Sequence, residues 1–94
     1  MRISYDAAKN ERNLRERGLS FETVYEFDFS TALQTVDTRR DYGELRIKAL
    51  GYLDQRLHAL CYKETEDGIR VISFRKANRR EQKKYDQAYR NYRR

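Results

Sequence analysis

The chain has 94 residues, enough for one domain with a modest hydrophobic core but too few for two, so we expect residues 1–94 to form a single domain. Hydrophobic residues make up 38% and aromatic residues 13% of the sequence, which argues against intrinsic disorder although 38% of the residues are charged. The net charge of +6 is concentrated near the end: residues 1–68 carry 11 Lys/Arg and 13 Asp/Glu, whereas residues 69–94 carry 10 and 2.

The first third of the chain is predicted to hold a short strand and two short helices. Arg2–Tyr5 has the pattern of a strand. Asp6 can cap a helix over Ala7–Gly18, and Gly18 is its expected end. This helix has only a thin apolar stripe, formed by Ala7, Asn10 or Glu11, and Leu14. Ser20 is a second N-cap candidate, opening a helix in which one face would hold Phe21, Val24, Tyr25, and then Phe27 or Asp28.

The middle of the chain is predicted to form strands. A short extended piece is expected near Leu33–Val36, followed by a polar turn. Residues 44–53, 56–63 and 69–75 then alternate between two faces, as strands do. Asp54–Gln55 and Glu64–Gly68 are plausible hairpin turns between them. These three strands therefore predict an antiparallel meander.

The last element is a predicted helix over residues 78–92. Positions spaced 4, 4, 3 and 4 apart share one face of it, namely Ala77, Glu81, Tyr85, Ala88 and Tyr92. The other faces carry Arg79, Arg80, Lys83, Lys84 and Arg90. The expected fold class is α+β, in the order β-α-α-β-β-β-α with the Leu33–Val36 piece as an additional strand. A small antiparallel sheet would be packed by an N-terminal helix pair and a C-terminal helix.

Three stretches of the sequence resemble the BrnT family, the toxins of bacterial type II toxin–antitoxin pairs. They are "DAAKNERNLRERGLSFE", "GELRIKALG" and "YKETEDGIRVISFRKANRREQKKY", which together span residues 6–85 in the family's order. The most specific part is the run 69–75 followed by Ala77, Arg79, Arg80, Glu81 and Tyr85. One departure is Glu16-Arg17-Gly18, where the family usually has Lys-His-Gly; Gly18 would preserve a helix-ending role, but not a chemical role of the histidine.

The resemblance implies a RelE-like fold, RNA cleavage that halts translation, and neutralisation by a cognate BrnA-type antitoxin protein. The partners expected from it are RNA and the antitoxin, with operator DNA contacted only through the antitoxin. A homodimer stays open as an alternative to a monomer. A cytoplasmic location is the default expectation, because the N-terminus has no secretion signal and no run of residues approaches a membrane span.

Metal-independent RNA cleavage uses the neighbouring 2′-hydroxyl as nucleophile, so the protein must stabilise charge on the phosphate and move protons. No metal or cofactor is expected, because the chain has one His, one Cys and no carboxylate cluster at ligand spacing. The single Cys61 is expected to be a small core residue.

The three middle strands supply candidate catalytic residues. We predict that Arg46 and Arg70 clamp phosphate, with Lys48 beside Arg46, and that His58 or Tyr62 transfers protons, provided that these faces of the strands coincide. The alternatives are a half-exposed strand histidine, a tyrosine that packs with its hydroxyl in water, and arginines in cross-strand salt bridges.

The junction between the third strand and the last helix supplies further candidates. Glu81 can form a capping box with Asn78, pair with and orient Arg75 or Arg70, or act as a general base. The nucleic-acid-binding candidates are Lys48, Arg75, Lys76, Arg79 and Arg80, most of which gather near a helix N-terminus. Their alternative is a solvated basic helix.

Two functions of other classes compete with a ribonuclease toxin. One is a noncatalytic nucleic-acid-binding or regulatory module, whose affinity would fall steeply with salt. The other is a structural partner whose basic face docks an acidic protein. A membrane-surface role is weaker, because the basic segment lacks a broad apolar face.

Overall fold

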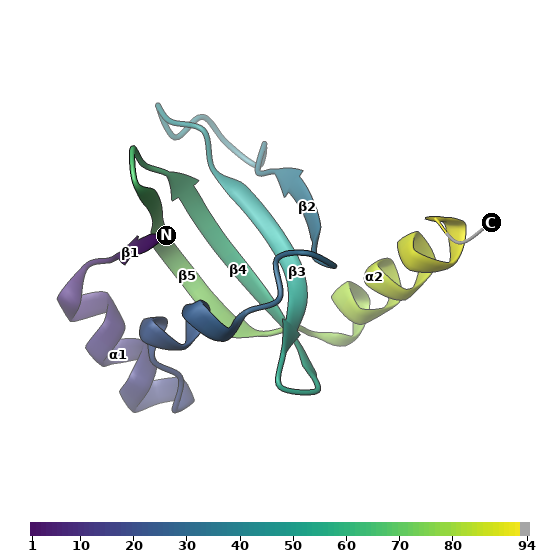
Figure 1. Ribbon diagram of the computed structural model, residues 1–94, viewed down its shortest axis with the longest axis horizontal. Helices are drawn as coiled ribbons and strands as arrows, with labels where there is room; N and C mark the ends of the chain where they lie inside the picture. Colours follow the sequence, from purple (N-terminus) through teal and green to yellow (C-terminus); the bar gives the residue numbers. More distant parts are fainter. Residues whose placement is uncertain (93–94) are drawn as a thin grey trace.

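Five strands form one mixed sheet in the computed structural model, which describes residues 1–92 (Figure 1). The elements in chain order are β1 (Arg2–Ser4), α1 (Ala7–Arg17), the 3-10 helix η1 (Phe21–Glu26), β2 (Leu33–Val36), β3 (Ile47–Leu53), β4 (Arg56–Glu64), β5 (Gly68–Lys76) and α2 (Arg79–Tyr92). The α+β class and the three-strand meander are therefore confirmed. The described side chains end at Asn91, so the predicted position of Tyr92 on the inner face of α2 lies outside them.

The strand order is β1-β5-β4-β3-β2, and β2 to β5 pair antiparallel. The prediction of a purely antiparallel sheet was wrong, because β1 pairs parallel to β5. This pairing brings the backbones of Arg2 and Gly68 so close that a Cβ at position 68 would overlap the carbonyl oxygen of Arg2. A glycine is needed at this contact, which fixes the N-terminus beside β5.

Helix α1 begins and ends where the sequence predicts but is not attached by an apolar stripe. Asp6 accepts a hydrogen bond from the Lys9 amide, and Gly18 ends the helix at φ 66°. None of the residues of α1 is buried, and Leu14 is 50% exposed. The apolar members of the thin stripe, Ala7 and Leu14, therefore do not attach the helix to the sheet. Two asparagine side chains attach the helix instead, as hydrogen-bond partners of η1 and β5.

The first of these is Asn10, whose Oδ1 accepts from the Phe21 amide at 2.7 Å. The second is Asn13, whose Nδ2 donates to the carbonyl oxygens of Leu19 and Phe74, each at 2.9 Å. Hydrogen bonds to otherwise unpaired backbone groups can hold a polar helix against the body of a protein. Helix α1 therefore lies beside β5 with a polar inner face.

The second predicted helix is the 3-10 helix η1, capped by Ser20 as expected. Its buried residues Phe21, Val24 and, at its end, Phe27 recur every third position, which matches three residues per turn. Tyr25 is exposed, and its hydroxyl accepts from the Ile3 amide. The 3-10 period explains why Tyr25 does not join the core as an α-helical spacing predicts.

Each sheet face has its own apolar cluster. The larger cluster lies between the sheet and η1 and includes Phe21, Val24, Phe27, Leu60, Val71 and Phe74. The smaller cluster lies under the start of α2, where Ala77 and Tyr85 pack on Leu50, Leu57 and Ala59. Figure 1 shows α2 running away from the sheet towards the C-terminus. Much of the sheet face on the α2 side is therefore covered by side chains and not by a helix.

In residues 1–92, none of the helices combines the length and apolarity that crossing a membrane requires.

Candidate functional site

A row of cations lies on the sheet face that α2 only partly covers. Residues paired across strands point to the same side, and the pairs Lys48–Cys61, Cys61–Ser73, Ala59–Arg75 and Lys63–Arg70 all lie on this side. Arg46 precedes Lys48 by two positions and so shares its side. We call the cations Arg39, Arg46, Lys48, Lys63, Arg70 and Arg75 the basic face.

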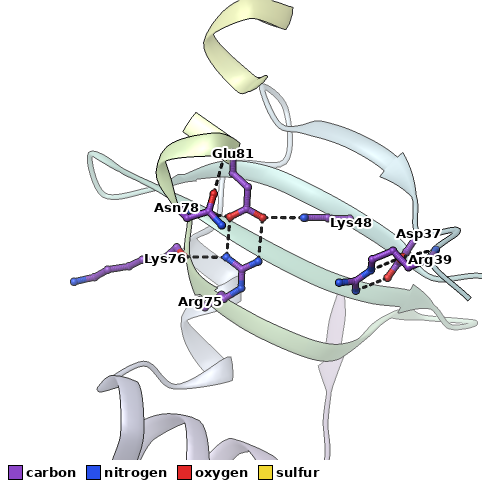
Figure 2. Close-up of polar contacts among 7 residues, drawn as sticks. All are labelled: Asp37, Arg39, Lys48, Arg75, Lys76, Asn78 and Glu81. Carbon is purple, nitrogen blue, oxygen red and sulfur yellow. Dashed lines mark hydrogen bonds and ion pairs between the residues drawn. The ribbon is translucent and has the colours of Figure 1, made fainter. Parts of the chain in front are cut away.

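The side chain of Glu81 reaches this surface from the start of α2 and joins two of its cations (Figure 2). Arg75 donates to both carboxylate oxygens, with Nη1–Oε1 and Nη2–Oε2 distances of 2.8 and 3.0 Å. Lys48 Nζ lies 2.8 Å from Oε2. Glu81 is only 6% exposed, so one buried carboxylate fixes the positions of an arginine and a lysine from two different strands.

Glu81 also forms the predicted capping box at the start of α2. Its Oε1 accepts from the Asn78 amide at 3.0 Å, and Asn78 Oδ1 accepts from the Glu81 amide at 2.9 Å. Two of the three predicted interpretations of Glu81 are therefore found together, the cap and the pairing with Arg75. The hydrogen bonds from Arg75 lower the pKa of Glu81 to about 2, which makes this carboxylate a weak base.

Acidification is expected to remove the stabilising contribution of Glu81. Its folded-state pKa lies below the ordinary value, so the contribution is fully present above about pH 4.5 and is lost as the pH falls towards 2. This pKa shift corresponds to a contribution on the order of 3 kcal/mol to the free energy of unfolding. Glu81→Gln should therefore be less stable than wild type at pH 6 in urea titrations, and the difference should shrink towards pH 2. Glu11→Gln, an exposed control, should show no such trend. A difference that is equal at pH 6 and pH 2 would contradict this role of Glu81.

A second carboxylate fixes Arg39 on the opposite side of the same surface. Asp37 is buried and accepts from Arg39 Nε at 2.9 Å and Nη2 at 2.8 Å, while the Tyr42 hydroxyl donates to it at 3.2 Å. The hydrogen bonds from Arg39 hold the pKa of Asp37 well below its usual range. The Arg39 side chain nevertheless stays 71% exposed. Figure 2 shows it projecting over the sheet towards Arg75.

Arg39, Lys48 and Arg75 surround a small cavity, which we call the anion pocket. Its floor is formed by Ala59, Leu60, Cys61 and Ser73, and its volume is about 90 Å³. That volume is well below the roughly 300–1,000 Å³ of typical small-molecule sites. Burial raises the pKa of the Cys61 thiol, so the floor offers a neutral thiol and a hydroxyl. Three cations around so small a space suit a compact anion such as a phosphate group.

The predicted clamps Arg46 and Arg70 lie on the basic face but outside the lining of the anion pocket. Arg46 stacks on the Tyr42 ring at 4.0 Å and pairs with Glu44, which also lies 3.4 Å from Lys63 Nζ. Arg70 makes no ion pair with any residue of the described range 1–92. Both arginines therefore flank the pocket, and Arg70 interacts electrostatically with Asp6 without forming a direct ion pair.

The two predicted proton-transfer residues are on the other side of the sheet. Tyr62 pairs with Ile47 and His58 with Gly51, so both point towards the large apolar cluster and not towards Lys48. The expectation that the two strand faces coincide was wrong. Both strands alternate as predicted, but their register places His58 and Tyr62 opposite to the cations.

Burial also limits the chemistry of these two residues. His58 is 4% exposed, its Nδ1 lies 2.8 Å from the Arg56 carbonyl oxygen, and burial lowers its pKa. The Tyr62 hydroxyl donates to Gln34 at 2.6 Å, and burial raises its pKa. A neutral imidazole and a neutral phenol therefore face the core, where an RNA on the basic face cannot contact them.

The predicted nucleic-acid-binding residues do not all lie at the anion pocket. Arg75 and Lys48 line the anion pocket. Lys76 pairs with His58 and so points to the opposite side of the sheet. Arg79 and Arg80 are exposed on α2, and their side chains make no hydrogen bond or ion pair with the part of the chain that is described. The first turn of α2 is occupied by Glu81, so its N-terminus already holds an anion.

The charges of this surface do not cancel. Six cations of the basic face meet three carboxylates, Asp37, Glu44 and Glu81, which leaves a net charge of +3. The cations of the pocket are held in place by hydrogen bonds before any ligand binds, so little reorganisation is needed to stabilise added negative charge. The arrangement can therefore bind a phosphodiester and stabilise the extra charge of its transition state.

Sequence reasoning missed Asp37, Arg39 and Ser73 as site residues. Arg39 lies in an irregular loop, where no periodicity of the sequence predicts the direction in which a side chain points. The available signal was the Asp37-x-Arg39 spacing followed by Tyr42, which lets a short loop close on itself through hydrogen bonds. Ser73 reaches the pocket because the pairing of β4 with β5 shifts register next to it.

No group of three or more His, Cys, Asp or Glu side chains placed to hold a metal ion occurs in residues 1–92. In a comparison with protein families, the model of a family described as the ribonuclease toxin BrnT of type II toxin–antitoxin systems matches residues 5–81. No curated protein matches the chain. The matched span includes all residues of the anion pocket together with Glu81.

Proposed function

The chain belongs to the BrnT family of ribonuclease toxins from type II toxin–antitoxin systems, and on this premise we propose that it cleaves RNA whose scissile phosphate binds in the anion pocket. The observation that carries the proposal is the convergence of Arg39, Lys48 and Arg75 on one cavity of the open sheet face. Such a constellation supplies charge stabilisation, which is often the largest contribution to catalysis of this kind of reaction.

In this proposal each pocket cation has a distinct task. Arg75 is held by Glu81 in a fixed orientation and donates to the phosphate oxygens, while Arg39 approaches from the opposite side. Lys48 lies between them and donates a proton to the leaving 5′-oxygen as the P–O5′ bond breaks. The 2′-hydroxyl forms the new P–O bond and releases its proton to a solvent water molecule, because no side chain of the pocket is a strong base. Glu81 is a positioning residue, because its carboxylate contacts the cations. Arg46 and Arg70 hold the flanking phosphates of the strand.

Cleavage is proposed to need no metal ion, because the fixed cations perform the task that a divalent ion performs in metal-dependent nucleases. We expect the purified protein to cleave single-stranded RNA equally well in EDTA and in Mg²⁺, and to leave 2′,3′-cyclic phosphate ends. DNA, which lacks the 2′-hydroxyl, should stay intact. Gel electrophoresis measures the cleavage of RNA and DNA, and mass spectrometry of the products identifies their ends. Loss of cleavage in EDTA, restored by added Mg²⁺, would refute the metal-independent mechanism, and binding of RNA without any cleavage would favour the noncatalytic module.

Inhibition of translation and neutralisation by a cognate antitoxin follow from the same site in this proposal. Cleavage of cellular RNA stops protein synthesis, and an antitoxin that covers the basic face with carboxylates blocks access of RNA to the pocket. Contact with operator DNA is assigned to the antitoxin. The proposed relation to RelE-like ribonucleases is supported by an antiparallel meander that carries the site on one open face.

A further inference from the structure

A second cavity lies next to the anion pocket. Its volume is about 280 Å³, close to the lower end of the roughly 300–1,000 Å³ seen for small-molecule sites. It is formed between α1 and β5, and Ser73 lines both this cavity and the anion pocket. The two cavities are therefore neighbours at Ser73.

The fold leaves room for this cavity at the edge of β5. Strand β1 ends at Ser4, which pairs with Arg70, so β5 has no neighbouring strand on that side beyond Arg70. Ile72 is the extra residue of a register shift, because Cys61 pairs with Ser73 while Tyr62 pairs with Val71. Such bulges redirect side chains and are common beside functional sites. Helix α1 lies along this free edge and contacts it through the Asn13 side chain, not through strand-like backbone pairing.

The inner face of α1 is polar, which is unusual for a helix beside a sheet. The cavity is lined from this helix by positions spaced i, i+3, i+4, i+7 and i+8, where a docked helix normally carries apolar residues, namely Lys9, Arg12, Asn13, Glu16 and Arg17. Within residues 1–92, the side chains of Lys9, Arg12, Glu16 and Arg17 make no ion pair. Phe21 and Ile72 add apolar walls.

We propose that this cavity binds the base of the nucleotide adjacent to the phosphate in the anion pocket; the proposal rests on the proposed binding of RNA to that pocket. Cations, apolar walls and a polar side chain for the base edge are the features with which proteins hold splayed single-stranded nucleotides. Arg12 contacts the backbone of this nucleotide, and the apolar walls contact the face of its base.

Glu16 gives the cavity a preference among bases. It is the only carboxylate among the eight residues that line the cavity, and an ionised carboxylate only accepts hydrogen bonds. It therefore favours bases with an exocyclic amino group, such as cytosine and adenine, over uracil, which has none. The cavity is thus a specificity subsite for an amino-bearing base.

Binding of 2′-O-methyl octanucleotides tests the subsite without cleavage. Fluorescence anisotropy with oligo(C), oligo(A) and oligo(U) should show wild-type affinity about 5- to 100-fold higher for the first two than for oligo(U). Glu16→Gln should reduce this ratio to about 3-fold or less, whereas Glu11→Gln, on the outer side of the same helix, should leave it unchanged. Arg12→Ala should weaken all three oligonucleotides alike, and Arg15→Ala should weaken none.

Each outcome supports or overturns one of the two proposals. If wild type binds all three oligonucleotides equally, or if Glu16→Gln keeps the full ratio, the subsite is overturned. If the ratio behaves as expected but cleavable RNA stays intact, the subsite stands and the proposed ribonuclease activity fails. In a cleaving protein, the mapped cut sites should lie next to amino-bearing bases and should spread to uracil in Glu16→Gln.

Discussion

Replacing Arg75 by alanine is expected to reduce the rate constant of RNA cleavage by at least about 100-fold, because one preorganised donor to the transition-state charge is lost. Arg75 is the pocket cation whose orientation is fixed by two hydrogen bonds to one carboxylate. Arg75→Lys keeps the charge but not the planar pair of donors, so its rate constant of cleavage should be about 10-fold below that of wild type. Single-turnover cleavage of a labelled RNA measures both variants.

The matched control is Arg80→Ala, which removes the same charge from an exposed position on α2. It should lower cleavage by less than about 3-fold at physiological salt, since Arg80 does not line the anion pocket and the charge of an exposed side chain is screened. Loss of Arg75 also removes a partner of the buried Glu81, so circular dichroism must show that the variant is folded under assay conditions. A folded Arg75→Ala protein that cleaves within 3-fold of wild type would remove the basis for placing the scissile phosphate in the anion pocket.

Replacing Phe74 by alanine is expected to lower the free energy of unfolding by about 3–5 kcal/mol. Phe74 is fully buried, and its ring packs against Phe27 and His58 at centroid distances of 6.0 and 5.3 Å. A domain of this size is typically stable by only about 5–15 kcal/mol, so a substantial part of its stability would be lost. The midpoint of thermal unfolding should fall by more than about 10 °C.

Leu45→Ala provides the comparison for this variant, because Leu45 is 63% exposed and its truncation leaves no cavity. Its midpoint should stay within about 3 °C of wild type. An unfolding midpoint of Phe74→Ala close to that of Leu45→Ala would show that the large apolar cluster does not determine the stability of the sheet. The two variants are compared by differential scanning calorimetry at equal concentration.

The sequence predicted local elements well, because each depends on neighbouring residues. Caps such as Asp6 and Ser20 and the alternation of β3 and β4 are local signals, and the structure confirms them. The alternation predicted for β5 was wrong beyond Val71, because the extra residue Ile72 places Ser73 on the side of Arg70 and Phe74 on the side of Ile69 and Val71. The parallel pairing of β1 with β5 was not predicted, since Arg2 and Gly68 are far apart in the chain. Likewise, the 3-10 period of η1 differs from an α-helical period by too little to be distinguished over six residues.

The candidate site was predicted only in part, because β4 is buried on both faces. When both sides of a strand are covered, alternation no longer separates an inner from an outer face. His58 and Tyr62 occupied the positions that look polar, yet they face the large cluster, while Ala59 and Cys61 lie under the cations. Glu81 was found because helical spacing, a capping motif and a nearby arginine all pointed to it.

The attachment of α1 by Asn10 and Asn13 has a consequence for how the molecule opens. Regions that bury little apolar surface separate from a folded protein at a lower free energy than its central strands. Helix α1 buries no residue, so local unfolding of this helix requires far less free energy than global unfolding. Helix α1, which carries Glu16, can therefore detach and rebind while β3, β4 and β5 stay paired. A long RNA can then enter the cavity between α1 and β5 from the side, without passing one of its ends through it.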